Sequence, residues 1–248
     1  MPANTKKMKL DEKILKSISG GTLFYPCSGQ DTNVPIKLFA PYIQQFWFAD
    51  ISYWIRPNSA DSANPLLQNW KDFEFLDFKV WYTPPEKREV RDAEFQNNYP
   101  WIDPCIRTER YLHIHTKRLV TIHRRRGYGT AALRKHINLL SIFFYRGDGP
   151  EGGSGTLWLR GKKNKPALIN DVLRKLINGG LIVTDGSNCR NRKGNPYRNF
   201  GMYRNKDLSN GDVKSVEAFT DGQGCKFTCV AYIGERKGPT LVWQVSHP

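Results

Sequence analysis

Apolar residues recur along this 248-residue chain in an order that predicts strands alternating with helices. The clearest helix covers residues 166–177, where leucine, isoleucine and valine side chains form one continuous stripe at helical spacing. Asn178-Gly-Gly is typical of a helix end, and the apolar run at residues 181–184 is typical of a buried strand. This stretch therefore predicts a helix, a tight turn and a strand, which is half of a βαβ unit.

The same order is found twice more. Strands are predicted at residues 22–25, 47–49, 119–123 and 140–145, and helices at residues 34–46 and 130–137. Residues 226–233 and 240–245 flank a turn and predict a C-terminal antiparallel β-hairpin. The pattern predicts a Rossmann-like α/β fold, with a mostly parallel sheet and helices on both of its faces.

One segment does not fit the alternation. Residues 61–103 hold nine acidic and five basic residues among many aromatic side chains and prolines. We therefore expect a single domain over residues 1–248 that carries an inserted acidic and aromatic lobe at about residues 55–110.

Composition changes the picture through its charge, which is +15 at pH 7 with a pI near 9.7. Residues 107–165 hold fourteen lysines and arginines against three acidic residues, so the charge is unevenly distributed. A one-sided positive field attracts polyanions, which favours nucleic acid as a partner.

Apolar runs are too short for a membrane helix, and the N-terminus has no secretory pattern, so we expect a cytoplasmic protein without a membrane partner. Five dispersed cysteines favour free thiols over a disulfide framework. His113, His115 and His123 lack a placed carboxylate or cysteine, so no metal site is predicted and exposed strand histidines are expected instead. The oligomeric state is left open.

Small and acidic residues gather in the loops that follow the predicted strands. In an open α/β sheet, ligands bind outside the carboxyl ends of the parallel strands, and an acid at a strand end accepts hydrogen bonds from ribose hydroxyls. The residues expected to bind a cofactor on this basis are Cys27, Ser28, Gly29, Gln30, Asp31, Asp50 and Asp185.

The order of these elements resembles the class I S-adenosylmethionine-dependent methyltransferase fold, whose sheet ends in a reversed hairpin strand. The resemblance is one of architecture and covers most of the chain. It implies that Pro26-Cys-Ser-Gly-Gln-Asp31 is the first cofactor loop, that Asp50 is the ribose-binding acid, and that residues 181–185 form the fifth strand. It also implies S-adenosylmethionine as the cofactor and methyl transfer to a nucleic acid or nucleotide-type substrate as the activity. The first loop holds one glycine where the family has several, and Arg146-Gly-Asp-Gly stands where amino-methylating enzymes have an Asn/Asp-Pro-Pro-Tyr motif.

The glycine-rich stretch at residues 147–155 offers Asp148 and Glu151 as catalytic residues, either as a general base or as hydrogen-bond acceptors. Its structural alternative is a flexible linker.

The basic loop Arg124-Arg-Arg126 lies between a predicted strand and a helix and is expected to bind nucleic-acid phosphates. Arg124-Arg-Arg-Gly-Tyr-Gly-Thr130 also resembles the pyrophosphate loop of GNAT-type acetyltransferases, which implies coenzyme A as an alternative ligand.

Two hypotheses from different classes follow. The first is a methyltransferase-like enzyme, and the second is a non-catalytic regulator or inhibitor that binds nucleic acid or another polyanion on a degenerate methyltransferase fold. An acyltransferase is the third and more distant alternative.

Overall fold

The computed structural model of this protein describes residues 10–50, 53, 64–82, 89–90, 101–102, 105–146, 168–185, 196–200, 203–204, 213–214, 217–233 and 240–248. Two compact units divide the chain: residues 1–18 and 139–248 belong to unit 1, and residues 19–138 belong to unit 2.

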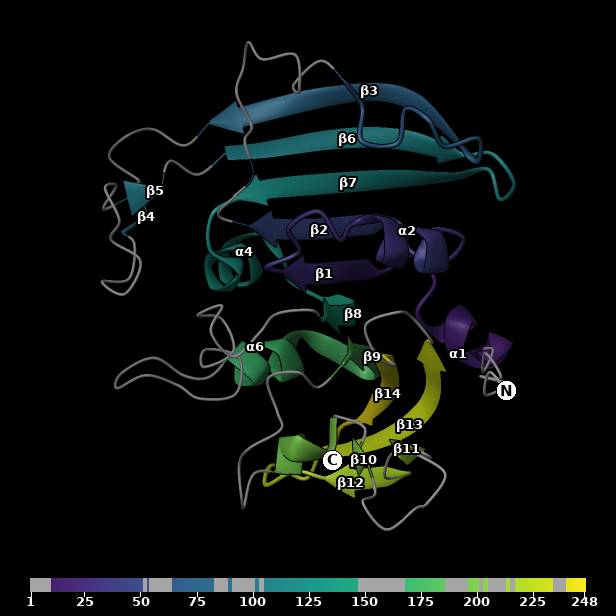
Figure 1. Ribbon diagram of the computed structural model, residues 1–248, viewed down its shortest axis with the longest axis vertical. Coiled ribbons are helices and arrows are strands. Elements are labelled where there is room, and N and C mark those ends of the chain that lie inside the picture. Colours follow the sequence, from purple (N-terminus) through teal and green to yellow (C-terminus); the bar gives the residue numbers. More distant parts are fainter. Residues whose placement is uncertain are drawn as a thin grey trace. The chain divides into compact units, whose positions relative to one another are not determined.

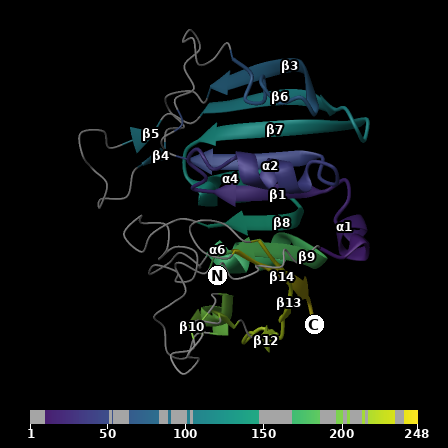
Figure 2. The ribbon, with the colours of Figure 1, turned by 45° about the vertical axis from the view of Figure 1, so that its right-hand side comes forward.

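Unit 2 contains a sheet of five strands, ordered β1-β2-β7-β6-β3, which lie side by side in Figures 1 and 2. Their bounds are β1 Thr22–Pro26, β2 Gln45–Asp50, β3 Phe73–Tyr82, β6 Cys105–His113 and β7 Arg118–Arg126. β1, β2 and β7 run parallel to one another, while β6 pairs antiparallel with both β7 and β3. The sheet therefore changes from parallel to antiparallel pairing at β7.

Two short helices pack on unit 2. Pro35, Ile36 and Phe39 are the buried residues of α2 (Asn33–Phe39), while Ala132 and Leu133 are those of α4 (Gly129–His136). A separate antiparallel pair joins β4 (Glu89–Val90) to β5 (Trp101–Ile102). Because each helix has only seven or eight residues, apolar burial stabilises it more than intrinsic helix propensity does.

Unit 1 also contains five main strands, ordered β12-β13-β14-β9-β8. Their bounds are β8 Leu140–Tyr145, β9 Leu176–Thr184, β12 Ala218–Thr220, β13 Lys226–Ile233 and β14 Thr240–Ser246. β8 and β9 are parallel, and the remaining neighbours are antiparallel. The smaller elements are α1 Glu12–Ser17, α6 Leu168–Lys175, the 3-10 helix η3 Pro196–Phe200 and the pair β10 Tyr203–Arg204 with β11 Val213–Lys214.

Aromatic side chains form much of the core of unit 1. Phe219 stacks on Phe227 with ring centroids 4.7 Å apart, and the buried Phe200 and Trp243 pack edge-on against Phe219. Each such pair adds roughly 1 kcal/mol to the free energy of burial. This packing explains why the C-terminal hairpin of β13 and β14, expected from its alternating residues, is present.

The predicted Rossmann-like fold with a mostly parallel sheet is wrong. Among the described strands, three neighbouring pairs are parallel and seven are antiparallel. The described part of the chain contains four α-helices of six to eight residues, too few and too short to cover both faces of the sheets. The architecture is predominantly β.

The resemblance to class I methyltransferases is corrected by the same findings, because that fold is rich in helices. A sequence pattern reports where apolar residues recur, whereas the direction in which a strand pairs depends on the neighbour it meets after folding. The segments at residues 73–82 and 105–113 illustrate this, since they become long antiparallel strands of unit 2.

The helix predicted at residues 166–177 is present as α6, but its predicted end and the turn after it are wrong. The helix α6 ends at Lys175, and β9 begins at Leu176, so the two glycines expected to separate helix from strand lie inside β9. Gly179 has φ +79°, and the pairing register with β8 shifts at this place. Glycine here supports a bulge in a strand rather than a turn after a helix.

The prediction of one domain with an insertion at residues 55–110 stays a prediction. The described part of that range includes all of β3 and the beginning of β6, which extend the sheet of unit 2.

Gly129 provides a test of how tightly α4 packs against β1. A Cβ atom at Gly129 would lie 2.4 Å from the Cβ of Pro26, which is far below van der Waals contact. We expect Gly129→Ala to lower the free energy of unfolding by about 1–3 kcal/mol, measured by urea denaturation. Gly222→Ala is the control, because its added Cβ meets no heavy atom within 4 Å. Equal effects of the two substitutions would contradict this account.

Candidate ligand site at the ends of three parallel strands

The carboxyl ends of β1, β2 and β7 meet at one edge of the sheet of unit 2. Pro26 is in register with Ala49, and Asp50 is in register with Arg126. The loops that follow the three strands are therefore neighbours, and they hold most of the residues that the sequence singled out within unit 2.

Asp50 joins these loops. Its Oδ2 atom accepts a hydrogen bond of 2.8 Å from the backbone N–H of Gly29, and its backbone carbonyl accepts one of 3.1 Å from the N–H of Gly127. One residue at the end of β2 thus holds both the loop after β1 and the loop after β7.

The loop after β1 is tightly turned. Cys27 and Gly29 have φ values of 54° and 49°, in the left-handed region that favours glycine. The N–H of Asp31 donates to the carbonyl of Ser28 at 2.8 Å, and the buried Tyr25 hydroxyl donates to Asp31 Oδ2 at 3.0 Å. For Cys27 this conformation costs about 1 kcal/mol, and strain of this kind is concentrated at functional sites.

Tyr53 adds a hydroxyl to the same cluster, and it shares a 2.5 Å hydrogen bond with Ser28 Oγ. Burial raises the pKa of Tyr53, and the nearby carboxylates of Asp50 and Asp31 raise it further, against the opposing effects of Ser28 and Arg124. Its hydroxyl therefore stays protonated at neutral pH and remains able to donate a hydrogen bond.

Arg124 brings a positive charge close to this cluster. Its guanidinium Nη2 donates to Glu109 Oε1 at 2.8 Å, and its side chain is 20% exposed. Glu109 is 1% exposed and also accepts from the Arg107 Nε and the Tyr111 hydroxyl. The Glu109 carboxylate on β6 thus orients Arg124 on the neighbouring strand β7.

Burial alone would raise the pKa of Glu109. This effect is outweighed by Arg124, the Tyr111 hydroxyl, the backbone N–H of Leu66 at 2.8 Å and Arg107, which together lower the pKa of Glu109. The side chain is therefore an ionised carboxylate inside the protein, which is stable only because charged and polar partners surround it.

The other basic residues expected to contact phosphate have different surroundings. Arg125 is 2% exposed, and its Nη1 donates to the carbonyl of Tyr128 at 3.3 Å, while Arg126 is half-buried. The two loop glycines proposed for coenzyme A also have local roles, since Gly127 binds Asp50 and Gly129 packs on Pro26. Binding of a ligand by these residues stays a prediction.

The remaining site predictions fall in other parts of the chain. Asp185 follows β9 and belongs to unit 1, where it is half-buried. Asp148 and Glu151 lie outside the described residues. The cluster therefore consists of Tyr25, Ser28, Gly29, Asp31, Asp50, Tyr53 and Arg124, which we call the strand-end site.

Tyr25, Tyr53 and Glu109 were not predicted from the sequence. A signal was available for Glu109: on β6, every second residue is buried, and Arg107, Glu109 and His113 are polar members of that buried row. Alternate residues of a strand point to the same face of the sheet. When charged residues share such a row with apolar ones, the row indicates a buried ion network. Treating this segment as part of an insertion concealed the pattern.

The three histidines do not all behave as exposed strand residues. His113 is buried and His115 is exposed, while His123 stacks on Trp47 at a centroid distance of 4.0 Å. Burial, with a smaller effect from His136, lowers the pKa of His123 to about 4, so that its ring is neutral at pH 7. Among the described residues, no group of three histidine, cysteine or acidic side chains is arranged to hold a metal ion.

Comparison of the chain with protein-family models, with curated proteins and with solved structures found no match. In the described part of the chain, no helix is long and apolar enough to cross a membrane.

Glu109→Gln tests the buried network. Glutamine keeps the shape but removes the charge that compensates Arg107 and Arg124, so we expect the free energy of unfolding to fall by about 3–5 kcal/mol. Glu12→Gln is the control, because the ion pair of Glu12 with Lys16 is exposed and such pairs contribute little to stability. Chemical denaturation at pH 7 measures both, and a loss for Glu109→Gln no larger than for the control would refute the network.

The pH dependence has a defined sign. Because the folded-state pKa of Glu109 is lowered, its contribution to stability is present above the ordinary glutamate pKa of about 4.3 and is lost as the pH falls through the folded-state value. The difference in stability between wild type and Glu109→Gln should therefore shrink below about pH 4.

Proposed function

We propose that this protein binds a nucleotide-type ligand at the strand-end site. The observation that carries the proposal is that Asp50 joins the loops after three parallel strands, through its carboxylate to Gly29 and its carbonyl to Gly127. In α/β sheets, ligands usually bind at the loops gathered at the carboxyl ends of parallel strands, and unit 2 has three such strands.

The side chains of the strand-end site suit a ligand rich in hydroxyl groups. The Asp50 and Asp31 carboxylates are acceptors for ribose hydroxyls, and the protonated Tyr53 hydroxyl is a donor. Arg124 supplies a positive charge for a carboxylate or phosphate group of the ligand. Gly29, which has no Cβ, permits close approach of the ligand to the backbone.

S-adenosylmethionine is the first ligand to examine, because it combines a ribose, a carboxylate and a reactive methyl sulfonium. In the reaction we propose, the bond between the methyl carbon and sulfur breaks and a bond to a nucleophilic nitrogen of a nucleic-acid base forms. The base releases one proton to solvent, and S-adenosylhomocysteine leaves. Positioning of the two reactants would provide most of the acceleration.

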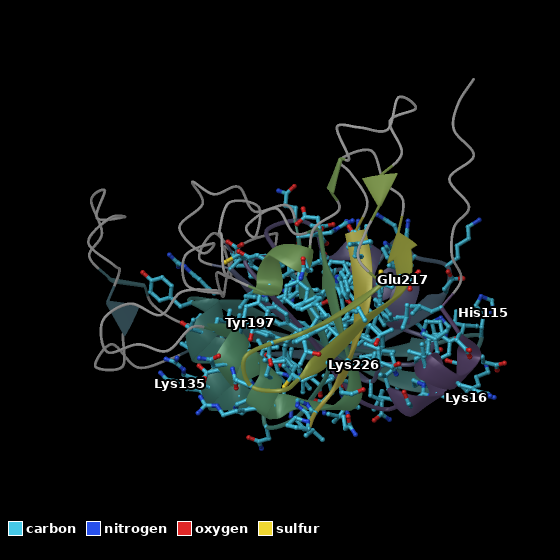
Figure 3. The ribbon with its side chains drawn as sticks, turned by 90° about the horizontal axis from the view of Figure 1, so that it is seen from below. Lys16, His115, Lys135, Tyr197, Glu217 and Lys226 are labelled. Carbon is cyan, nitrogen blue, oxygen red and sulfur yellow. The ribbon has the colours of Figure 1, made fainter. Side chains whose placement is uncertain are left out.

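Charge supports nucleic acid as the larger partner. Arg134, Lys135 and His136 are exposed in the last turn of α4, and Lys135 is labelled in Figure 3. Positive side chains at this end of a helix also interact favourably with the helix dipole. If the protein binds nucleic acid and no nucleotide-type ligand, the non-catalytic function is the one that remains.

Asp50→Asn tests the ligand site. Asparagine retains an oxygen that accepts the Gly29 N–H, so the loop should keep its fold, while the charged acceptor for a ribose hydroxyl is lost. We expect the affinity for S-adenosylmethionine, measured by isothermal titration calorimetry, to fall about 10- to 100-fold.

The matched control is Asp72→Asn. Asp72 directly precedes β3, and its Oδ1 lies 2.8 Å from His115 Nε2 in the turn before β7. This substitution should leave the affinity for S-adenosylmethionine unchanged. No binding of S-adenosylmethionine, S-adenosylhomocysteine or ATP to the wild-type protein would reject the proposed ligand site.

Neutralising α4 tests the nucleic-acid partner. For the double variant Arg134→Gln and Lys135→Gln, we expect weaker binding to duplex DNA and a plot of log affinity against log salt that is shallower by about 1.8, since each phosphate contact contributes about 0.9. Lys71→Gln is the control for loss of an exposed lysine elsewhere in unit 2. An unchanged salt dependence in the double variant would show that α4 does not contact phosphate.

A further inference from the structure

The strand β3 forms one edge of the sheet of unit 2, as Figure 1 shows, and it pairs through its other side with β6. Among the described residues, no strand pairs with its outer side. Large apolar side chains along it are exposed: Phe75 37%, Leu76 44%, Phe78 44%, Trp81 62% and Tyr82 49%. Natural proteins protect edge strands from other chains, so a ten-residue edge with this composition requires an explanation.

The register with β6 assigns the side chains of β3 to two faces. Phe78 lies opposite Glu109, on the face that carries the buried network. Asp77 and Lys79 lie opposite Arg110 and Thr108, on the other face. Leu76 is the extra residue of a bulge, because the register shifts between Phe75 and Asp77. From Asp77 to Tyr82 the strand is regular.

The charge of this region argues against nucleic acid as the occupant of the edge. Residues 61–103 hold nine acidic and five basic residues, and within β3 Glu74 and Asp77 outnumber Lys79. Phosphate would be repelled by this segment. A second copy of the chain is not repelled in this way. Antiparallel pairing of two identical strands can place an acidic residue of one copy opposite a basic residue of the other.

We propose that β3 pairs antiparallel with β3 of a second copy of this chain, around a two-fold axis at Phe78. This register places Asp77 of each copy directly opposite Lys79 of the other, and the two Phe78 side chains face each other on the axis. The proposal does not depend on the proposed ligand site.

The register agrees with the pleat. In antiparallel strands, residues directly opposite each other point to the same face, and Asp77 and Lys79 do share one face. Opposite charges at such positions are favourable, and like charges are unfavourable. The bulge at Leu76 lies outside the three central pairs, so it does not disturb them.

Arg110 also fits this arrangement. Its Nε donates to Asp77 Oδ1 at 2.7 Å, and its Nη2 donates to the other carboxylate oxygen. Each carboxylate oxygen has two acceptor positions, so Asp77 can bind Arg110 of its own chain and Lys79 of the second copy together. The result is an alternating row of charges across the joined sheets.

Charge reversal tests the pairing by analytical ultracentrifugation of the full chain over a range of concentrations. The wild-type protein should form a dimer. Lys79→Asp places aspartate opposite Asp77, and Asp77→Lys places lysine opposite Lys79, so each variant alone should raise the dimer dissociation constant about tenfold or more. An equimolar mixture of the two variants should dimerise again, since every opposed pair then carries opposite charges.

Lys71→Asp is the control, because Lys71 is exposed and precedes β3, and this variant should dimerise like the wild type. Circular dichroism of each variant checks that it is folded, and if Asp77→Lys is not, Lys79→Asp alone still decides. A monomeric wild type, a Lys79→Asp variant that dimerises normally, or a mixture of two folded variants that fails to associate would each overturn the proposal. If the wild type is monomeric and Trp81→Ala abolishes its DNA binding, nucleic acid and not a second copy is the occupant of the β3 edge.

Discussion

The ionised carboxylate of Glu109 inside unit 2 is the constraint on which the candidate site depends. A charge removed from water needs partners on every side, and Glu109 obtains them from Arg107, Arg124, Tyr111 and the backbone of Leu66. These partners come from β6, from β7 and from the segment before β3. The Glu109 carboxylate thus connects the antiparallel strands to β7, which is the last of the parallel strands. It also holds Arg124, whose charge lowers the pKa of Tyr53.

Asp50 has the complementary role at the strand ends. Glu109 is enclosed and serves the fold, whereas Asp50 is half-buried and holds two loops at the edge of the sheet. The surroundings of the two acids differ: full burial with two arginines favours a permanent ion network, while partial exposure beside a left-handed loop is compatible with contact with a ligand. For this reason the proposed function rests on Asp50.

The sequence allowed local elements to be predicted better than their pairing. The apolar run at residues 140–145 is β8 with the predicted bounds, and the helix expected at residues 130–137 is α4 shifted by one residue. The position of Asp50 at a strand end was also predicted from the sequence, because an acidic residue after an apolar run is typical of the end of a strand. The antiparallel pairing of β3 with β6 was not readable, since it joins segments about thirty residues apart and depends on which strand edges remain open. Glu109 was missed for a different reason, because its place in the alternating row of β6 was concealed when the segment was assigned to an insertion.

The distribution of charge in unit 2 reconciles an acidic edge with the proposed attraction for polyanions. Arg107 and Arg125 are buried, and Arg107 is paired with Glu109, so these two guanidinium groups are not exposed for direct contact with a polyanion. The helix α4, which carries exposed positive charge at its end, packs against β1 and β2. Between β2 and β3 there are three strand spacings of about 4.8 Å, so these two strands are roughly 14 Å apart. This exceeds the screening length of about 8 Å at physiological salt, so the acidic residues of β3 do not cancel the field around α4. Binding of a polyanion near α4 and pairing of two copies through β3 are therefore compatible on one sheet.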